Sequence, residues 1–196
     1  MSKLYFRYGV MESGKTTALL QVAHNYNKKG MEVLLLKPKI DTKGQDKVIS
    51  RLGVERKVDY LVETSDNLYS FIKEHKRVDA IIVDEAQFLT SNQVDELYYI
   101  TKEENIPVLC YGLRCDFQMI GFTGSTRLLQ IADDIEELKT ICSCGKKATQ
   151  NLRLLNGRPV FDGEQIEIDN QKDIQYVGVC GNCYLLLKDG ANNDNR

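Results

Sequence analysis

The 196-residue sequence has no apolar run long enough to cross a membrane and no strong excess of charge. A transmembrane helix needs about 20 apolar residues, and Met1-Ser2-Lys3 leads into a strand-like segment instead of a secretory signal. The formal net charge is −2, and there is no basic stripe, so a large electrostatic footprint for nucleic acid is not expected. We therefore expect a globular cytoplasmic protein that binds neither membrane nor nucleic acid.

The six cysteines are not expected to form disulfides, because metal binding, catalysis or burial is commoner in a cytoplasmic protein. Four of them form two close pairs, Cys142/Cys144 and Cys180/Cys183. Two pairs from separate turns can complete a tetrahedral zinc site, which would stabilise a segment too small for its own core. Free or redox-active thiols are the alternative.

The most informative motif is the loop at residues 9–16, which has the form G-x-x-x-x-G-K-[ST] of a phosphate-binding loop. Its members are Gly9, Val10, Met11, Glu12, Ser13, Gly14, Lys15 and Thr16. A strand-like segment precedes it and a helix-like segment, ended by Gly30, follows. In this context backbone N–H groups surround a nucleotide phosphate at a helix N-terminus, whereas the alternative is an ordinary glycine-containing turn.

A second signal is the pair Asp84-Glu85, which follows the apolar strand predicted at residues 80–83. In P-loop enzymes an aspartate at this place holds Mg²⁺, with the hydroxyl of Thr16 as the second protein contact. Glu85 is then placed to accept a proton from the group that attacks the γ-phosphate. That group is water in an ATPase and a substrate hydroxyl in a kinase, and these two motifs do not decide between them. The alternative is an acidic surface turn.

Strand-like and helix-like segments alternate up to residue 138, which predicts a parallel sheet with flanking helices. Strands are predicted at 4–8, 33–36, 80–83 and 106–111, and helices after the phosphate loop, after Thr64 and Ser65, and from Thr90 or Ser91. Residues 39–57 lack periodicity and are predicted to be a mobile loop. Short alternating segments at 165–168 and 175–179 predict small antiparallel strands. The predicted domains are 1–138, a P-loop nucleotide-binding α/β domain; 139–188, a zinc-binding domain; and 189–196, a disordered tail.

Five strings together resemble the cellular, tetrameric (type II) thymidine kinases, in a variant of one bacterial branch, over nearly the whole chain. They are GVMESGKT at 9–16, VDEAQF at 83–88, CYGLRCDF at 110–117, LKTICSCGKKA at 138–148, and the closing Cys180-x-x-Cys183-Tyr184. The resemblance implies a RecA-like P-loop sheet with a small zinc-bound lasso domain. It also implies phosphorylation of the thymidine 5′-hydroxyl by ATP and Mg²⁺, feedback inhibition by dTTP, and a homotetramer.

The resemblance assigns roles to particular residues. Glu85 is the general base, and Thr16 and Asp84 hold magnesium. The ATP and phosphate site comprises residues 9–16 with Asp41, Lys43, Arg51, Asp84 and Gln87. The thymidine site comprises Met11, Leu113, Phe117, Phe122, Asn151, Ile168 and Tyr176, and the zinc ligands are Cys142, Cys144, Cys180 and Cys183.

This chain departs from the family pattern at two places. Lys43 stands where the family has an arginine, and it carries the charge without a bidentate guanidinium contact. Asp169-Asn170 replaces a Gly-Gly pair of the lasso, and both residue types tolerate left-handed backbone.

Two other readings of the same motifs remain. One is an ATPase of nucleic-acid type with a zinc ribbon, since Asp84-Glu85-Ala86-Gln87 resembles a helicase box. Such motors need two nucleotide-binding domains, and this chain has room for one. The other is a non-catalytic zinc-ribbon interaction module fused to a nucleotide switch. Both predict that thymidine has no effect on ATP turnover.

Overall fold

The centre of the molecule is a six-stranded sheet in which every strand runs parallel to its neighbours. The computed structural model describes residues 1–42, 44–75, 77–165 and 174–194. In spatial order the strands are β5 (Tyr60–Val62), β2 (Val33–Pro38), β6 (Ala80–Val83), β7 (Val108–Gly112), β1 (Leu4–Tyr8) and β8 (Asp134–Glu137). The predicted α/β class with a parallel P-loop sheet is therefore confirmed.

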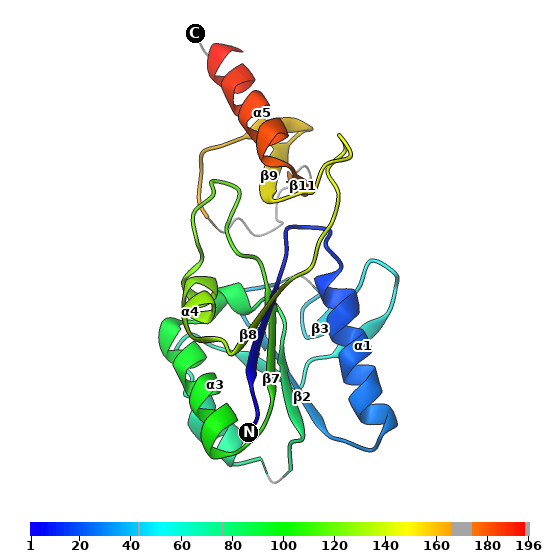
Figure 1. Ribbon diagram of the computed structural model, residues 1–196, viewed down its shortest axis with the longest axis vertical. Coiled ribbons are helices and arrows are strands. Elements are labelled where there is room, and N and C mark those ends of the chain that lie inside the picture. The colour runs from blue at the N-terminus through cyan, green and yellow to red at the C-terminus, as the bar shows by residue number, and fades with distance from the viewer. Residues whose placement is uncertain (43, 76, 166–173, 195–196) are drawn as a thin grey trace.

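Helices cover both faces of this sheet (Figure 1), so the central strands are apolar on both sides. One face is covered by α1 (Lys15–Lys28), and the other by α2 (Leu68–Lys73), α3 (Ser91–Glu103) and α4 (Thr123–Ile131). Successive residues of β6 point to opposite faces: Ile82 packs with α1, whereas Ile81 and Val83 pack with the other three helices. Among the described residues, no helix combines the length and the apolar character needed to cross a membrane.

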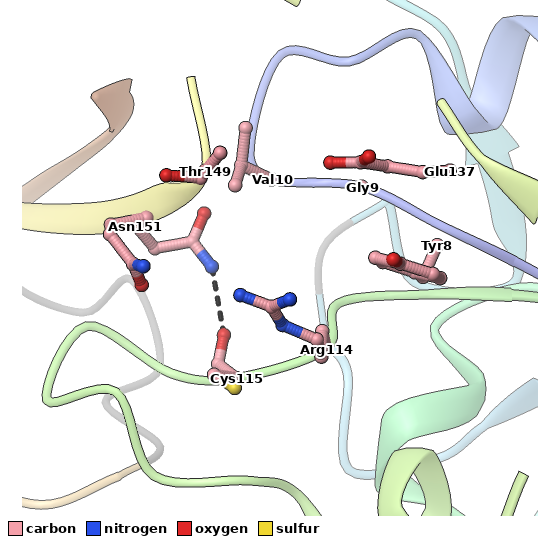
Figure 2. A pocket seen from close by; sticks show the side chains of 9 residues that line it. Tyr8, Gly9, Val10, Arg114, Cys115, Glu137, Thr149 and Asn151 are labelled. Atoms are coloured by element: carbon pink, nitrogen blue, oxygen red, sulfur yellow. Dashed lines mark hydrogen bonds between the residues drawn. The ribbon is translucent and has the colours of Figure 1, made fainter. Parts of the chain in front are cut away.

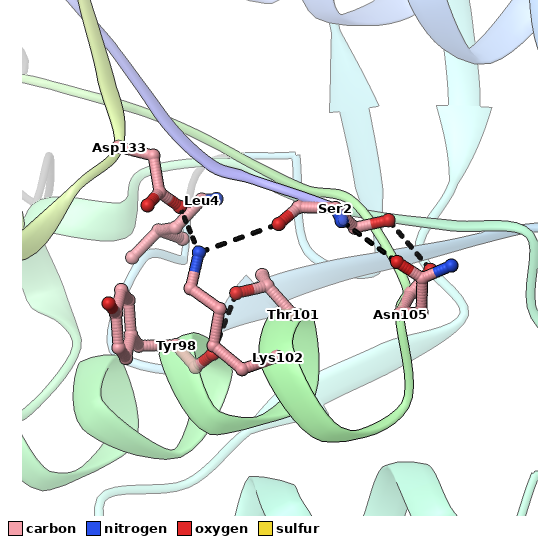
Figure 3. A network of polar contacts seen from close by, with 7 residues as sticks. All are labelled: Ser2, Leu4, Tyr98, Thr101, Lys102, Asn105 and Asp133. Atoms are coloured by element: carbon pink, nitrogen blue, oxygen red, sulfur yellow. Dashed lines mark hydrogen bonds and ion pairs between the residues drawn. The ribbon is translucent and has the colours of Figure 1, made fainter.

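A polar network fixes the start of β1 against the end of α3 (Figure 3). The Lys102 ammonium lies 2.6 Å from a carboxylate oxygen of Asp133, and the same oxygen accepts from the Leu4 N–H at 2.7 Å. Ser2 donates two further hydrogen bonds to Asn105, from its N–H to Oδ1 at 2.9 Å and from its hydroxyl to the carbonyl oxygen at 2.7 Å. Because β1 leads directly into the phosphate loop, this network anchors the strand at the end opposite that loop.

A smaller antiparallel sheet lies beyond the carboxyl end of the large sheet, next to the phosphate loop (Figure 1). Its strands, in spatial order, are β10 (Arg158–Val160), β9 (Gln150–Leu155) and β11 (Ile174–Val179), followed along the chain by α5 (Gly181–Asp194). Their inward side chains form a separate core with the buried cysteines Cys142 and Cys180. The antiparallel strand predicted at 175–179 is confirmed, and the one at 165–168 lies largely outside the described residues.

Three predicted segments differ from the structure. Residues 39–57 were predicted to be a mobile loop but contain a hairpin of β3 (Lys47–Ile49) and β4 (Glu55–Lys57), because Val48 is buried in the core beneath α1. The helix predicted after Thr64 and Ser65 begins at Leu68, and its N-cap is neither of these residues but Asn67, whose side chain accepts from the Ser70 N–H. The tail was predicted to be disordered from residue 189, but α5 continues to Asp194, since each added residue completes a further helical hydrogen bond.

Helix α4 packs closely on the short 3₁₀ helix η1 (Ala86–Phe88), and Gly124 lies at the contact. A Cβ there would lie 2.5 Å from the Ala86 carbonyl oxygen and 2.8 Å from that of Leu89. We expect Gly124→Ala to lower the free energy of unfolding by about 1–3 kcal/mol through overpacking, measured by urea denaturation. Gly190→Ala is the control, because Gly190 has nothing within 4 Å of that position. Equal denaturation midpoints for the two variants would contradict this packing.

Candidate active site

The phosphate loop is shaped by two left-handed residues and one position that admits no side chain. Glu12 has φ of 68° and Gly14, which caps α1, has φ of 80°. A Cβ on Gly9 would lie 2.3 Å from Ser13 Oγ and 2.6 Å from the Leu138 carbonyl oxygen. The loop therefore folds back on itself between the end of β1 and the first turn of α1, as an anion-binding loop at a helix N-terminus must.

Lys15 and Asp84 place opposite charges at the floor of this loop. Lys15 is 9% exposed, and its ammonium donates to the carbonyl oxygens of Gly9 at 3.1 Å and Val10 at 2.9 Å. Asp84 follows β6 directly and is 6% exposed. Burial, and after it the charge of Glu85, raises the pKa of Asp84 to about 7, while Lys15 acts in the opposite direction. A cation would favour the ionised form of this carboxylate, so Asp84 suits a magnesium ligand.

Glu85 is held in a fixed orientation by Gln87. The backbone of Glu85 is left-handed, with φ of 49°, and its carboxylate accepts from Gln87 Nε2 at 2.5 Å. The Gln87 side-chain oxygen accepts in turn from the Leu113 N–H at 3.0 Å. Gly112 makes this bridge sterically feasible, since a Cβ there would lie 2.6 Å from Gln87 Oε1. The buried Gln87 thus links the predicted base to the segment that follows β7.

The structure spreads the other predicted phosphate residues around the loop. Arg51 forms an ion pair with Glu12 of the loop itself. Asp41 lies 2.9 Å from the ammonium of Lys37, which is buried at the carboxyl end of β2. Lys43 lies outside the described residues. Lys37 was not among the predicted residues, although a lysine directly after the apolar run of residues 33–36 and before Pro38 lies at the end of a predicted buried strand.

Among the predicted thymidine residues, Phe117 and Tyr176 are brought together. Their rings are T-shaped with centroids 6.5 Å apart, and the buried guanidinium of Arg153 lies 3.7 Å above the Phe117 ring. Arg153 also donates to the Tyr176 hydroxyl at 2.9 Å. Leu113 is half-buried beside Gln87, and Met11 is half-buried in the phosphate loop. Ile168 lies outside the described residues.

Phe122 and Asn151 are placed differently from the other predicted base contacts. Phe122 is buried at the N-cap of α4, and its ring lies edge-on to that of Phe88, with the ring centroids 5.5 Å apart. The Asn151 carboxamide is bonded to backbone on both sides: it accepts from the Met11 N–H and donates to the Cys115 carbonyl oxygen, each at 2.8 Å. Figure 2 shows the second of these bonds at the wall of a small cavity behind the loop.

Four sulfur atoms form a cluster that can hold a metal ion. The Sγ atoms of Cys142, Cys144, Cys180 and Cys183 all lie within 4.8 Å of one another. The Cys183 N–H points to Cys180 Sγ at 3.5 Å, and backbone N–H groups of Cys144 and Cys180 lower the pKa of Cys142 to about 6. Four thiols that converge from two turns, with N–H groups directed at sulfur, fit the donor set of a structural metal.

The parallel sheet, the phosphate loop after β1 and the acidic pair after β6 define a P-loop protein of the α/β class. The thymidine kinase family model matches residues 2–184, which is nearly the whole chain. The chain therefore belongs to the thymidine kinase family.

Several bacterial relatives match this chain over most of its length. The thymidine kinase of Rhodopirellula baltica is 47% identical over 194 residues, covering 96% of this chain and 89% of that protein. The thymidine kinase of Lactobacillus acidophilus is 46% identical, covering 92% and 94%. A crystal structure of the Pif1 helicase from Candida albicans is 15% identical with a TM-score of 0.43, over 71% of this chain and 36% of that chain. A likeness at that score bears on neither fold nor function.

The raised pKa of Asp84 predicts an unusual dependence of stability on pH. Between its ordinary value of 3.8 and about 7, the folded protein holds a proton on Asp84 that the unfolded chain has released. Stability contributed by this group is therefore present at low pH and lost as the pH rises through that window. We expect Asp84→Asn to remove this decline when urea denaturation is measured from pH 3.8 to about 7, without magnesium or nucleotide. A variant that declines as steeply as the unsubstituted protein would contradict the assignment.

Proposed function

We propose that this protein transfers the γ-phosphoryl group of ATP to the 5′-hydroxyl of thymidine, giving ADP and dTMP for nucleoside salvage. The observation that carries the proposal is the placement of Glu85. Gln87 donates to the Glu85 carboxylate at 2.5 Å and accepts from the Leu113 N–H, which supports a base held in one orientation beside the segment that follows β7.

The chemistry follows from the charges around the loop. The Glu85 carboxylate accepts the proton of the 5′-hydroxyl as its oxygen attacks the γ-phosphorus and the bond to the ADP oxygen breaks. Lys15 and the backbone N–H groups of the loop neutralise the phosphate charge. Thr16 and Asp84 would hold Mg²⁺, which offsets charge on the phosphate oxygens when it is bound.

The thymidine side of the proposed site is formed by aromatic residues and by the sheet next to the cysteine cluster. Phe117 and Tyr176, which meet edge to face and are held together by Arg153, would shape the nucleoside side of the site. Zn²⁺ is the metal that four cysteine thiolates favour, and here it would hold the small sheet of β10, β9 and β11, which we call the lasso sheet, beside the nucleotide site. Membership of the family supports a cytoplasmic homotetramer that dTTP inhibits.

A nucleoside panel with ATP and Mg²⁺ tests the proposal directly. We expect ADP release to depend on thymidine and to yield phosphorylated nucleoside, because the proposed transfer requires the nucleoside hydroxyl as the acceptor. ATP turnover that ignores every nucleoside, in folded protein with a filled cysteine site, would favour the ATPase reading instead.

Glu85→Gln separates binding from chemistry. The amide keeps the size of the side chain but cannot accept a proton, so we expect kcat to fall by about 10²–10⁴-fold while ADP binding is retained. Glu74→Gln, at an exposed position after α2, is the matched control. Unchanged turnover in Glu85→Gln would remove Glu85 from the role of base.

A further inference from the structure

The lasso sheet is joined to the phosphate loop by one buried carboxamide. Asn151 lies on β9, is 4% exposed, and accepts from the Met11 N–H through Oδ1 at 2.8 Å. Its Nδ2 donates to the Cys115 carbonyl oxygen, also at 2.8 Å (Figure 2). One side chain therefore connects three segments that are far apart in the sequence: the phosphate loop, the segment after β7, and the lasso sheet.

A second contact joins the same two parts without any hydrogen bond. Gly178 of β11 is the register partner of Asn151 in the lasso sheet. A Cβ on Gly178 would lie 2.8 Å from Val10 Cγ2 and 2.9 Å from the Met11 carbonyl oxygen. Val10 and Met11 of the phosphate loop thus pack directly against the backbone of Gly178. A side chain at this position would push the two loop residues away from the sheet.

These contacts act on the half of the loop that precedes Glu12, where Lys15 of α1 also donates to the carbonyl oxygens of Gly9 and Val10. The second half leads into the first turn of α1, whose backbone bonds begin with the Ala18 N–H to the Gly14 carbonyl. Val10 and Met11 precede the left-handed residue Glu12, and a non-glycine residue in that conformation needs support from its surroundings. The bond to Asn151 also turns the Met11 N–H toward β9.

We propose that Asn151 is a positioning residue that holds the first half of the phosphate loop in the shape that binds nucleotide. The inference rests on the proposed function, since it takes this loop to be the ATP site. Without the carboxamide, Val10 and Met11 sample other conformations, and nucleotide binding must then order them. The lasso sheet consequently contributes to nucleotide affinity as well as to the nucleoside side of the site.

Calorimetric titration of Mg·ADP into the full-length protein, without nucleoside, tests this role. We expect Asn151→Ala to weaken ADP binding about tenfold, the value of one net hydrogen bond. Gly178→Ala is expected to weaken it similarly by displacing the same two loop residues. Gln175→Ala, exposed on β11, and Gly181→Ala, with nothing within 4 Å of the added Cβ, are the matched controls.

Arg153→Lys distinguishes positioning from a general loss of stability. Arg153 lies two residues from Asn151 on β9, and its contacts reach Phe117, Tyr176 and the Glu164 carbonyl. We expect this variant to raise the KM for thymidine with ADP affinity unchanged, whereas Asn151→Ala weakens ADP binding. ADP binding by Asn151→Ala as tight as in the unsubstituted protein, or equal losses of both substrates in both variants, would overturn the proposal. Failure of the unsubstituted protein to bind ADP would instead refute the proposed function.

Discussion

The parallel register of β1, β6 and β7 is the constraint on which the site depends. Tyr8 pairs with Gly112, and Val83 pairs with Cys110, so the chain leaves all three strands at one edge of the sheet. At that edge the phosphate loop, the acidic pair and the segment after Gly112 meet, although about a hundred residues separate the first from the last. Gly112 carries no side chain, and this lets Gln87 join the predicted base to the neighbouring segment.

The site is also built from outside the sheet. The lasso sheet contacts the phosphate loop through Asn151 and Gly178, and it contacts the Phe117 ring through Arg153. Two of the four clustered cysteines precede β9 along the chain, and the other two follow β11. A metal held there would therefore stiffen both strands at their common end. The lasso sheet would then stabilise both the ATP side and the nucleoside side of the site.

Local sequence patterns predicted the parts of this site that depend on local chemistry. The phosphate loop, the strand before Asp84 and the cysteine pairs each carry a spacing that their geometry requires. The bonds of Gln87 and Asn151 could not be predicted, because they join backbone groups that only the fold brings together. The hairpin within residues 39–57 was missed for a similar reason, since burial of Val48 beneath α1 overrides its weak periodicity. The buried pair Lys37–Asp41 depends on the turn after β2.

The proposed function requires that the γ-phosphoryl group pass to a nucleoside hydroxyl and not to water. Phosphorus NMR of ATP consumed with excess thymidine measures this partition in one experiment. We expect one phosphomonoester coupled to the 5′ protons of thymidine, formed in equal amount to ADP, with little inorganic phosphate. Inorganic phosphate as the main product, at a rate that thymidine does not change, would contradict it.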